Sequence, residues 1–267
     1  MATDVHKYSN AELYVHLHPS FFAYTIFNVS SNQYEIVEAV MHDGRSVINN
    51  KELSHWLSEH QHIFNQAYTI TKISINATAF SLLDNKDLAT VENFSTLNDY
   101  QATTEMLLVD ESWTTGCIQY AIKKSVYKIL LGYFDKQDIH FGDIGLLTAI
   151  DQFDEPDSFG ICQILQDEAT ISIVKNGQLI LFNKFTIKNS EDLLYYILLC
   201  FQSNDLDPNT NRLFVCGLIE KNAPMYQLIY EYVRNVELVP TPKSDVVLSP
   251  EKDWSLHYFY NLLNMRT

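Results

Sequence analysis

One order of secondary structure is predicted twice in this chain of 267 residues: three strands, a helix, and further strands that alternate with helices. The first copy starts near Leu13 and the second near Ile161. Three strands in direct succession predict an antiparallel meander, because short polar turns link antiparallel strands. The strand after the helix then returns to the same sheet. The repeat therefore predicts two halves with one plan, and it disfavours a single doubly wound parallel sheet.

Apolar runs bounded by polar turns mark the strands of the first copy, and apolar residues at helical spacing mark its crossover helix. The acidic, proline-containing stretch 151–157 ends this pattern. It is the expected linker between two lobes, 1–152 and 158–267. The elements predicted before it are strands over 12–18, 21–29, 34–41, 67–76, 106–109, 117–121 and 139–141, and helices from Asn50 to His60, over 85–94, over 126–134 and from Leu146 to Ile150.

The second copy gives the stronger local signals. Asn176-Gly177 predicts a tight hairpin, because both residues tolerate positive φ. Asn189 or Ser190, followed by two acids, predicts a helix start. That helix is apolar almost all round, so we expect it to be deeply buried. The predicted elements are strands over 159–166, 169–175, 178–187, 212–217 and 236–239, and helices over 190–201, 225–233 and 254–263.

Charge and composition exclude some classes of partner. The formal charge is −15, from 18 basic and 33 acidic residues. Nucleic acid and anionic membrane surfaces need an excess of Lys and Arg, so neither is an expected partner. No apolar run approaches the length of a membrane span, and we expect a cytoplasmic protein without membrane insertion. The four cysteines are far apart and are expected to be buried and reduced.

A three-strand meander, a crossover helix and alternating strands and helices form the ribonuclease H-like unit. Two such units in tandem make the actin-like ATPase fold. The expected fold class is therefore α/β with mixed sheets, built from two ribonuclease H-like domains.

Three segments of the second half carry a family resemblance: Ile171–Phe185, Glu191–Leu198 and Leu213–Gly217. Through them the chain resembles a bacterial family of proteins of unknown function with an actin-like ATPase fold. The resemblance is weaker in the first half, at Thr78–Leu83. The chain is more distantly similar to the cytoplasmic actin-like assembly proteins of type IV pilus and type II secretion systems. The resemblance implies the fold and brings no activity with it.

An ATPase of this fold grips phosphates with an Asp-x-Gly hairpin in each lobe: the Asp binds the metal, and glycine lets backbone N–H groups approach phosphate oxygens. The first hairpin, at Pro19-Ser20, has neither acid nor glycine, and proline removes a donor. The second, at Asp167-Glu168, has no glycine. Asp167 is a candidate metal contact, and the alternative is that Asp167-Glu168 is simply a polar β-turn.

Gly217 ends a predicted strand at the place where this fold has a glycine against adenosine. Asp167 and Gly217 are thus the two candidate cofactor-binding residues, for Mg-ATP. The alternative for Gly217 is a glycine required by a turn between strand and helix. Because both phosphate hairpins are altered, we expect no bound cofactor and no catalytic residue.

Several histidines are candidate metal ligands. His16 and His18 are two apart on a predicted strand, so they share a face and could form half a site, which His42 could join. Chance spacing is the alternative, and no metal is expected. His60, near a helix end, is expected to bond terminal carbonyl groups instead.

The leading functional hypothesis is a non-catalytic, actin-like cytoplasmic protein that binds another protein in an assembly. Its tyrosines could supply a partner surface or belong to the core. A residual nucleotide or phosphometabolite binder is the second hypothesis. A ribonuclease H-type nuclease is disfavoured, because the first strand offers only Glu12 to a two-metal centre. The tyrosines in question are Tyr195, Tyr196, Tyr226, Tyr230 and Tyr232.

Overall fold

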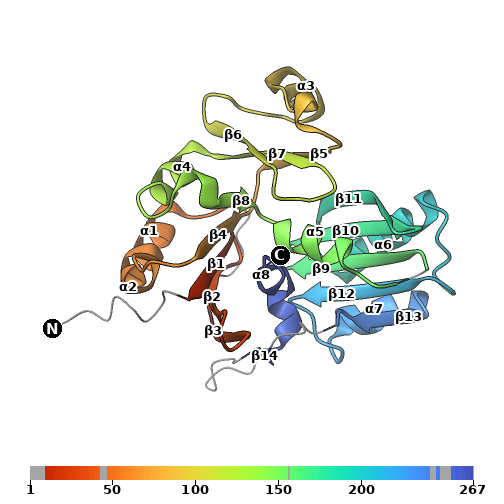
Figure 1. Cartoon of the computed structure of the whole chain (residues 1–267). Coiled ribbons are helices and arrows are strands. Elements are labelled where there is room, and N and C mark those ends of the chain that lie inside the picture. The colour runs from red at the N-terminus through yellow and green to blue at the C-terminus, as the bar shows by residue number, and fades with distance from the viewer. Residues whose placement is uncertain (1–9, 43–46, 156, 241–244, 247–253, 267) are drawn as a thin grey trace. The chain divides into compact units, whose positions relative to one another are not determined.

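The computed structural model describes residues 10–42, 47–155, 157–240, 245–246 and 254–266 (Figure 1). The chain divides into two compact units. Unit 1 comprises residues 1–149, 243–252 and 261–267, and unit 2 comprises residues 150–242 and 253–260. The division therefore assigns residues 261–267 to the same unit as the first half of the chain, and the lobe boundaries predicted above stay a prediction.

The main sheet of unit 1 contains the predicted meander. Its strands are β1 (Ala11–His18), β2 (Phe21–Asn28), β3 (Gln33–Met41), β4 (Ile70–Ile75), β8 (Ile139–Phe141) and β14 (Asp245–Val246). They pair in the order β14-β3-β2-β1-β4-β8, with β1, β2 and β3 antiparallel. Strand β4 is parallel to β1, and β8 is parallel to β4. Every residue of β1 is buried, including the polar Glu12, His16 and His18.

Unit 1 also holds a second sheet that the sequence did not predict as a separate layer. Its strands are β5 (Ala79–Leu83), β6 (Glu105–Asp110) and β7 (Cys117–Lys123), antiparallel in the order β5-β7-β6. The single helix expected over 85–94 is wrong. A 3-10 turn, η1 (Lys86–Leu88), is followed by a new helix, α3 (Val91–Leu97), because the Thr90 hydroxyl accepts the Asn93 N–H and starts it.

Three further helices of unit 1 lie near their predicted positions, whereas the short helical segments Gln61–Phe64 and Lys136–Asp138 were not predicted. Asn49, and not Asn50, caps the first of them, since its side chain accepts the N–H groups of Lys51 and Glu52. His60 Nδ1 lies 2.8 Å from the Trp56 carbonyl oxygen, as expected for a histidine at a helix end. These helices are α1 (Asn50–Glu59), α2 (Gln61–Phe64), α4 (Lys124–Leu130), the 3-10 turn η2 (Lys136–Asp138) and α5 (Ile144–Asp151), which begins in unit 1.

Unit 2 repeats the strand order of unit 1. Its strands are β9 (Phe159–Leu165), β10 (Glu168–Lys175), β11 (Gln178–Thr186), β12 (Arg212–Gly217) and β13 (Asn235–Leu238). They pair as β11-β10-β9-β12-β13, with the first three antiparallel and β9, β12 and β13 parallel. This matches β3-β2-β1-β4-β8 of unit 1 strand for strand. The duplicated plan predicted from the sequence is therefore present.

Helices α6 (Ser190–Ser203) and α7 (Pro224–Tyr232) pack on the five-stranded sheet and close the core of unit 2 (Figure 1). Asn176 and Gly177 have φ of 52° and 73°, as a tight hairpin requires. The short helices η3 (Leu256–Phe259) and α8 (Tyr260–Leu263) follow. The expectation that α6 is buried all round is wrong, because Tyr195 is 61% exposed.

All four cysteines are free and buried, as the sequence indicated. Burial raises the pKa of the Cys200 thiol to about 11 and raises that of Cys162 further, so neither is a thiolate at neutral pH. No helix in the described ranges is long and apolar enough to cross a membrane.

Thiol titration tests this burial. In the native protein at pH 8 we expect no rapid reaction of the cysteines with a disulfide reagent, because a buried neutral thiol is a poor nucleophile. In guanidinium chloride all four should react. Rapid reaction of even one thiol per native chain would contradict the burial of that cysteine.

Candidate functional site

The β1–β2 hairpin is the first place to look for phosphate binding. His18 pairs with Phe21, so Pro19 and Ser20 form a two-residue turn. Proline has no N–H, and the Ser20 N–H donates to His18 Nδ1 at 3.1 Å. The His18 ring is buried within unit 1. Both backbone positions at the tip are therefore without an N–H for a phosphate oxygen, and this role of His18 carried no signal in the sequence.

His16 belongs to a buried polar cluster in unit 1. The Asn261 side-chain amide donates to the Gly142 carbonyl oxygen at 2.6 Å and to His16 Nδ1 at 3.0 Å, while its oxygen accepts the Leu146 N–H at 2.8 Å. Ser74 Oγ lies 2.7 Å from the same His16 nitrogen. Since an amide nitrogen only donates, His16 Nδ1 acts as an acceptor and the ring proton is on Nε2. His16 is thus a structural acceptor that orients Asn261.

The three histidines considered for a metal site do not meet. The rings of His16 and His18 stack at 6.3 Å and both contact Phe21. His42 packs on Phe22 instead, with ring centroids 4.5 Å apart. Consecutive strand residues point to opposite faces, so His42 lies on the other face and the hypothesis that it joins the pair is wrong. Among the described residues no three His, Cys, Asp or Glu are grouped so that they could hold a metal.

The corresponding hairpin of unit 2 has a different tip. Leu165 pairs with Glu168, so the turn consists of Gln166, at a φ of 52°, and Asp167. Lys184 Nζ lies 3.1 Å from the Glu168 carboxylate and neutralises it. The half-exposed Asp167 carboxylate forms no hydrogen bond or ion pair with another described residue. Asp167 is therefore a single accessible acid, which alone is a weak metal ligand.

Gly217 is required by the packing of unit 2. Its φ is 84°, and a Cβ there would lie 2.9 Å from the N and C atoms of Ile164 and closer still to its carbonyl oxygen. The next residue, Leu218, donates its N–H to that same oxygen at 2.7 Å. A strand-to-helix turn against β9 thus accounts for this glycine without a ligand.

The loop after Gly217 is held by residues that follow much later in the chain. Tyr258 and Ser255 both donate to Glu220 Oε1, at 2.6 and 2.8 Å, and in that order they lower the pKa of the carboxyl group. His257 Nε2 donates to the Ile219 carbonyl oxygen at 2.6 Å. The Glu220 carboxylate and the Ile219 carbonyl oxygen are therefore already bonded inside unit 2.

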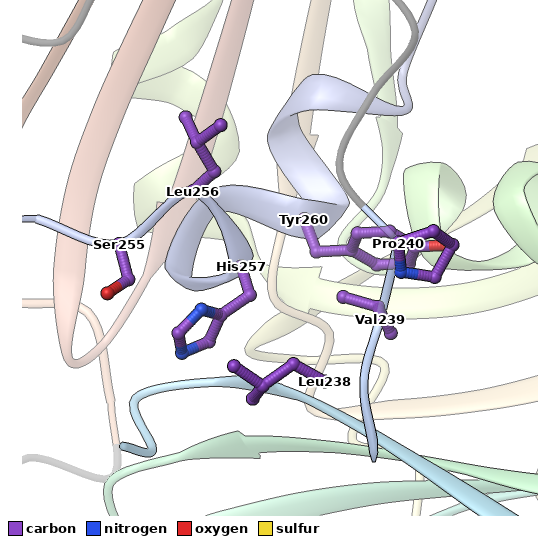
Figure 2. Close-up of a pocket in the computed structure, with 7 residues that line it drawn as sticks. All are labelled: Leu238, Val239, Pro240, Ser255, Leu256, His257 and Tyr260. Carbon is purple, nitrogen blue, oxygen red and sulfur yellow. The ribbon is translucent and has the colours of Figure 1, made fainter. Parts of the chain in front are cut away.

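A pocket of about 260 Å³ lies beside this contact (Figure 2). One side is the end of β13 and the residues after it, and the other is the segment that includes His257. The lining is mainly apolar, so the pocket suits a small apolar group and contains no carboxylate. Sequence analysis missed it, since the lining segments read as a strand end and a final helix. The lining residues are Leu238, Val239, Pro240, Ser255, Leu256, His257 and Tyr260.

A further polar cluster joins the two sheets of unit 1. Asp110, at the end of β6, accepts the Phe141 N–H of β8 at 2.8 Å and the Ser112 hydroxyl at 2.5 Å. His140 Nδ1 lies 3.2 Å from both Asp110 oxygens and 3.3 Å from Ser112 Oγ. In a Ser-His-Asp relay, serine and aspartate contact different ring nitrogens, whereas here both contact Nδ1. The cluster therefore connects β6 to β8 and does not have the geometry of a catalytic relay.

Solved structures with the same fold identify the architecture. A Bacteroides thetaiotaomicron protein described as having an actin-like ATPase fold and unknown function superposes with a TM-score of 0.72 and 16% identity, over 88% of this chain and 93% of that one. The PilM-PilN type IV pilus biogenesis complex gives a TM-score of 0.59 and 10% identity, over 95% and 97%. The ethanolamine utilization protein EutJ from Carboxydothermus hydrogenoformans gives 0.53 and 6%, over 96% and 88%.

No curated protein matches the chain. The structural likenesses show the fold, so the expectation of an actin-like ATPase fold is confirmed. The sequence model of a family described as "protein of unknown function (DUF3822)" matches residues 2–236. This agrees with the family resemblance found in the sequence. The chain belongs to the DUF3822 family, whose members share a domain of unknown function.

Proposed function

We propose that this protein is a non-catalytic member of the actin-like fold that acts in the cytoplasm by binding a partner protein in an assembly. The observation that carries the proposal is the β1–β2 tip, where Pro19 has no N–H and the Ser20 N–H is bonded to His18. A phosphate clamp needs free backbone donors at this position. The altered tip therefore favours the use of the fold for binding without ATP turnover.

Two further observations support the proposal. In the loop after Gly217, the Glu220 carboxylate and the Ile219 carbonyl are bonded by Ser255, His257 and Tyr258 of the same unit, so these two groups are already occupied. Among solved structures of this fold, PilM is found in a complex with PilN, which shows that a protein of this architecture can bind a protein partner. For the present chain, we likewise propose a protein partner.

Calorimetric titration with Mg-ATP tests the absence of nucleotide binding. We expect no binding heat at millimolar ATP, because one hairpin has no tip donors and the other offers one acid, Asp167. The Asp167→Ala variant should give the same flat titration. Glu191→Ala, an exposed acid elsewhere in unit 2, is the matched control for loss of one negative charge.

One observation favours the second candidate function, a nucleotide or phosphometabolite binder. Asp167 is half-exposed and its carboxylate is not bonded to any described residue. If Mg-ATP binds at micromolar concentration, and Asp167→Ala abolishes binding while Glu191→Ala does not, the non-catalytic proposal is wrong and this alternative replaces it.

A further inference from the structure

The pocket beside His257 is a cavity that the proposed function does not use. It lies within unit 2 and has a volume of about 260 Å³. The end of β13 with the residues after it forms one wall, and the segment that includes η3 forms the other (Figure 2). An apolar cavity of about 150 Å³ is enough to bind benzene. The volume therefore accommodates a group larger than one benzene ring, such as a bicyclic ring.

Hydrogen bonds inside unit 2 fix both walls of the pocket. In the first wall, the Val239 N–H donates to the Val215 carbonyl oxygen at 3.0 Å, which continues the pairing of β12 with β13. In the second wall, His257 Nε2 donates to the Ile219 carbonyl oxygen at 2.6 Å. Because these contacts exist without a ligand, little free energy is lost in ordering the protein when a ligand binds.

The lining of the pocket suits a neutral ligand. Its seven residues include no Asp, Glu, Lys or Arg. Burial raises the pKa of the Tyr260 hydroxyl above its usual value, so this group is uncharged at neutral pH. An ionised ligand would lose its hydration here without gaining an ion pair, and an anion would also meet the formal charge of −15. Nucleotides, phosphorylated compounds and carboxylates are therefore disfavoured.

His257 offers the ligand a hydrogen-bond acceptor. A carbonyl oxygen only accepts, so the Ile219 contact places the proton of the neutral ring on Nε2 and leaves a lone pair on Nδ1. No described residue bonds Nδ1, and His257 is only 8% exposed. Figure 2 shows the ring between Leu238 and Leu256. A largely buried acceptor favours a ligand that donates one N–H or O–H group.

The pocket also favours an aromatic ligand over an aliphatic one. Two of its lining residues, His257 and Tyr260, carry rings, and the others are mainly aliphatic. Ring contacts add to the free energy that comes from burying apolar area. A flat bicyclic molecule can contact both rings and the aliphatic side chains together.

We propose that this pocket binds a small neutral aromatic molecule with a single N–H or O–H donor, of the indole or phenol class, which donates to His257 Nδ1. The occupant is a free molecule and not a side chain of a partner protein, because the volume matches one whole bicyclic ring. The site goes beyond the proposed function and does not depend on it.

NMR titration of the full-length protein with indole, and with indene as the matched ligand, tests this inference. Indene has the same bicyclic shape but no N–H donor. We expect indole to shift the backbone amide signals of residues 238–239 and 255–260 in a saturable manner. The expected Kd is on the order of 1 mM or lower, as suits a ligand of this size.

His257→Gln isolates the contribution of the acceptor. The glutamine amide keeps a donor for the Ile219 carbonyl oxygen but has no acceptor at the position of Nδ1. The ratio of the indene Kd to the indole Kd should therefore fall roughly fivefold in this variant, and the ratio cancels the different hydrophobicity of the two ligands. Leu256→Trp fills the pocket from a half-buried position and should abolish binding of both. Leu228→Trp, half-buried on α7 and outside the lining, should bind both like wild type.

The inference is overturned if indole binding does not saturate, if indole shifts other amides, or if His257→Gln leaves the ratio of the two Kd values unchanged. Unaltered binding by Leu256→Trp would overturn it as well. If N-acetyltryptophan amide shifts these signals and indole does not, the occupant is a side chain of a partner and the inference is wrong. Should the variants fail to fold, the wild-type indole titration decides by the location of the shifted amides.

Discussion

Replacing Gly217 by alanine should lower the free energy of unfolding by about 4 kcal/mol or more and lower Tm by roughly 10 °C. Alanine at a φ of 84° carries a backbone cost of about 1–2 kcal/mol. The new Cβ also collides with the Ile164 backbone, which is part of the β9–β12 pairing and cannot move without disturbing the sheet. Urea unfolding followed by circular dichroism measures the difference.

Gly177→Ala is the matched control, because it separates the two costs. Gly177 has a φ of 73°, but a Cβ there meets nothing within 4 Å. The Gly177→Ala substitution should therefore lower the free energy of unfolding by only about 1 kcal/mol, from the backbone conformation alone. If Gly217→Ala is no worse than Gly177→Ala, the close approach to Ile164 is not what fixes this glycine, and a role in ligand contact gains support.

Removing the Asp110 carboxylate should lower the free energy of unfolding by about 3 kcal/mol, the second largest effect we expect. Asp110→Ala leaves the Phe141 and Ser112 N–H groups without their acceptor and separates β6 from β8. Glu111→Ala is the control. Glu111 forms an exposed pair with Lys86 at 2.6 Å, and its loss should change stability by less than about 1 kcal/mol. Equal losses of unfolding free energy in the two variants would contradict the structural role of Asp110 between β6 and β8.

The Asp110 effect should depend on pH. Burial pushes its pKa up, but the His140 and Ser112 contacts and the Phe141 N–H outweigh burial and hold the pKa below its usual value. A carboxyl group with a lowered folded pKa stabilises the protein above the unfolded pKa of about 4, and this contribution is lost as the pH falls through the folded value. The stability gap between wild type and Asp110→Ala should therefore be full at pH 7 and narrow below pH 4.

The strand order could be predicted because it depends on local signals that occur twice. The Asn176-Gly177 turn, the Asn189 cap and the strand over 212–217 are each specified by a few adjacent residues. Strand β5 was missed because its residues are all partly exposed and lack a clean alternation. Its pairing with β7 is a tertiary contact between distant segments, which residue patterns do not reveal.

The candidate site was predictable only in part. The absence of acid and glycine at Pro19-Ser20 is visible in the sequence. That His18 turns back to bind the Ser20 N–H, and that Asn261 reaches His16 across 245 positions, is not visible, because both depend on side-chain directions set by the folded sheet. Asp167 and Gly217 remain predictions as nucleotide contacts. The close packing against Ile164 is enough to explain why residue 217 is glycine.

The tip of the β1–β2 hairpin determines how many substitutions an engineered phosphate clamp would need at this position. Replacing Pro19 restores one N–H but leaves the Ser20 N–H bonded to His18. Replacing His18 frees that N–H but leaves proline beside it. Neither single change rebuilds the pair of donors. A phosphate clamp at this tip would therefore need several substitutions made together.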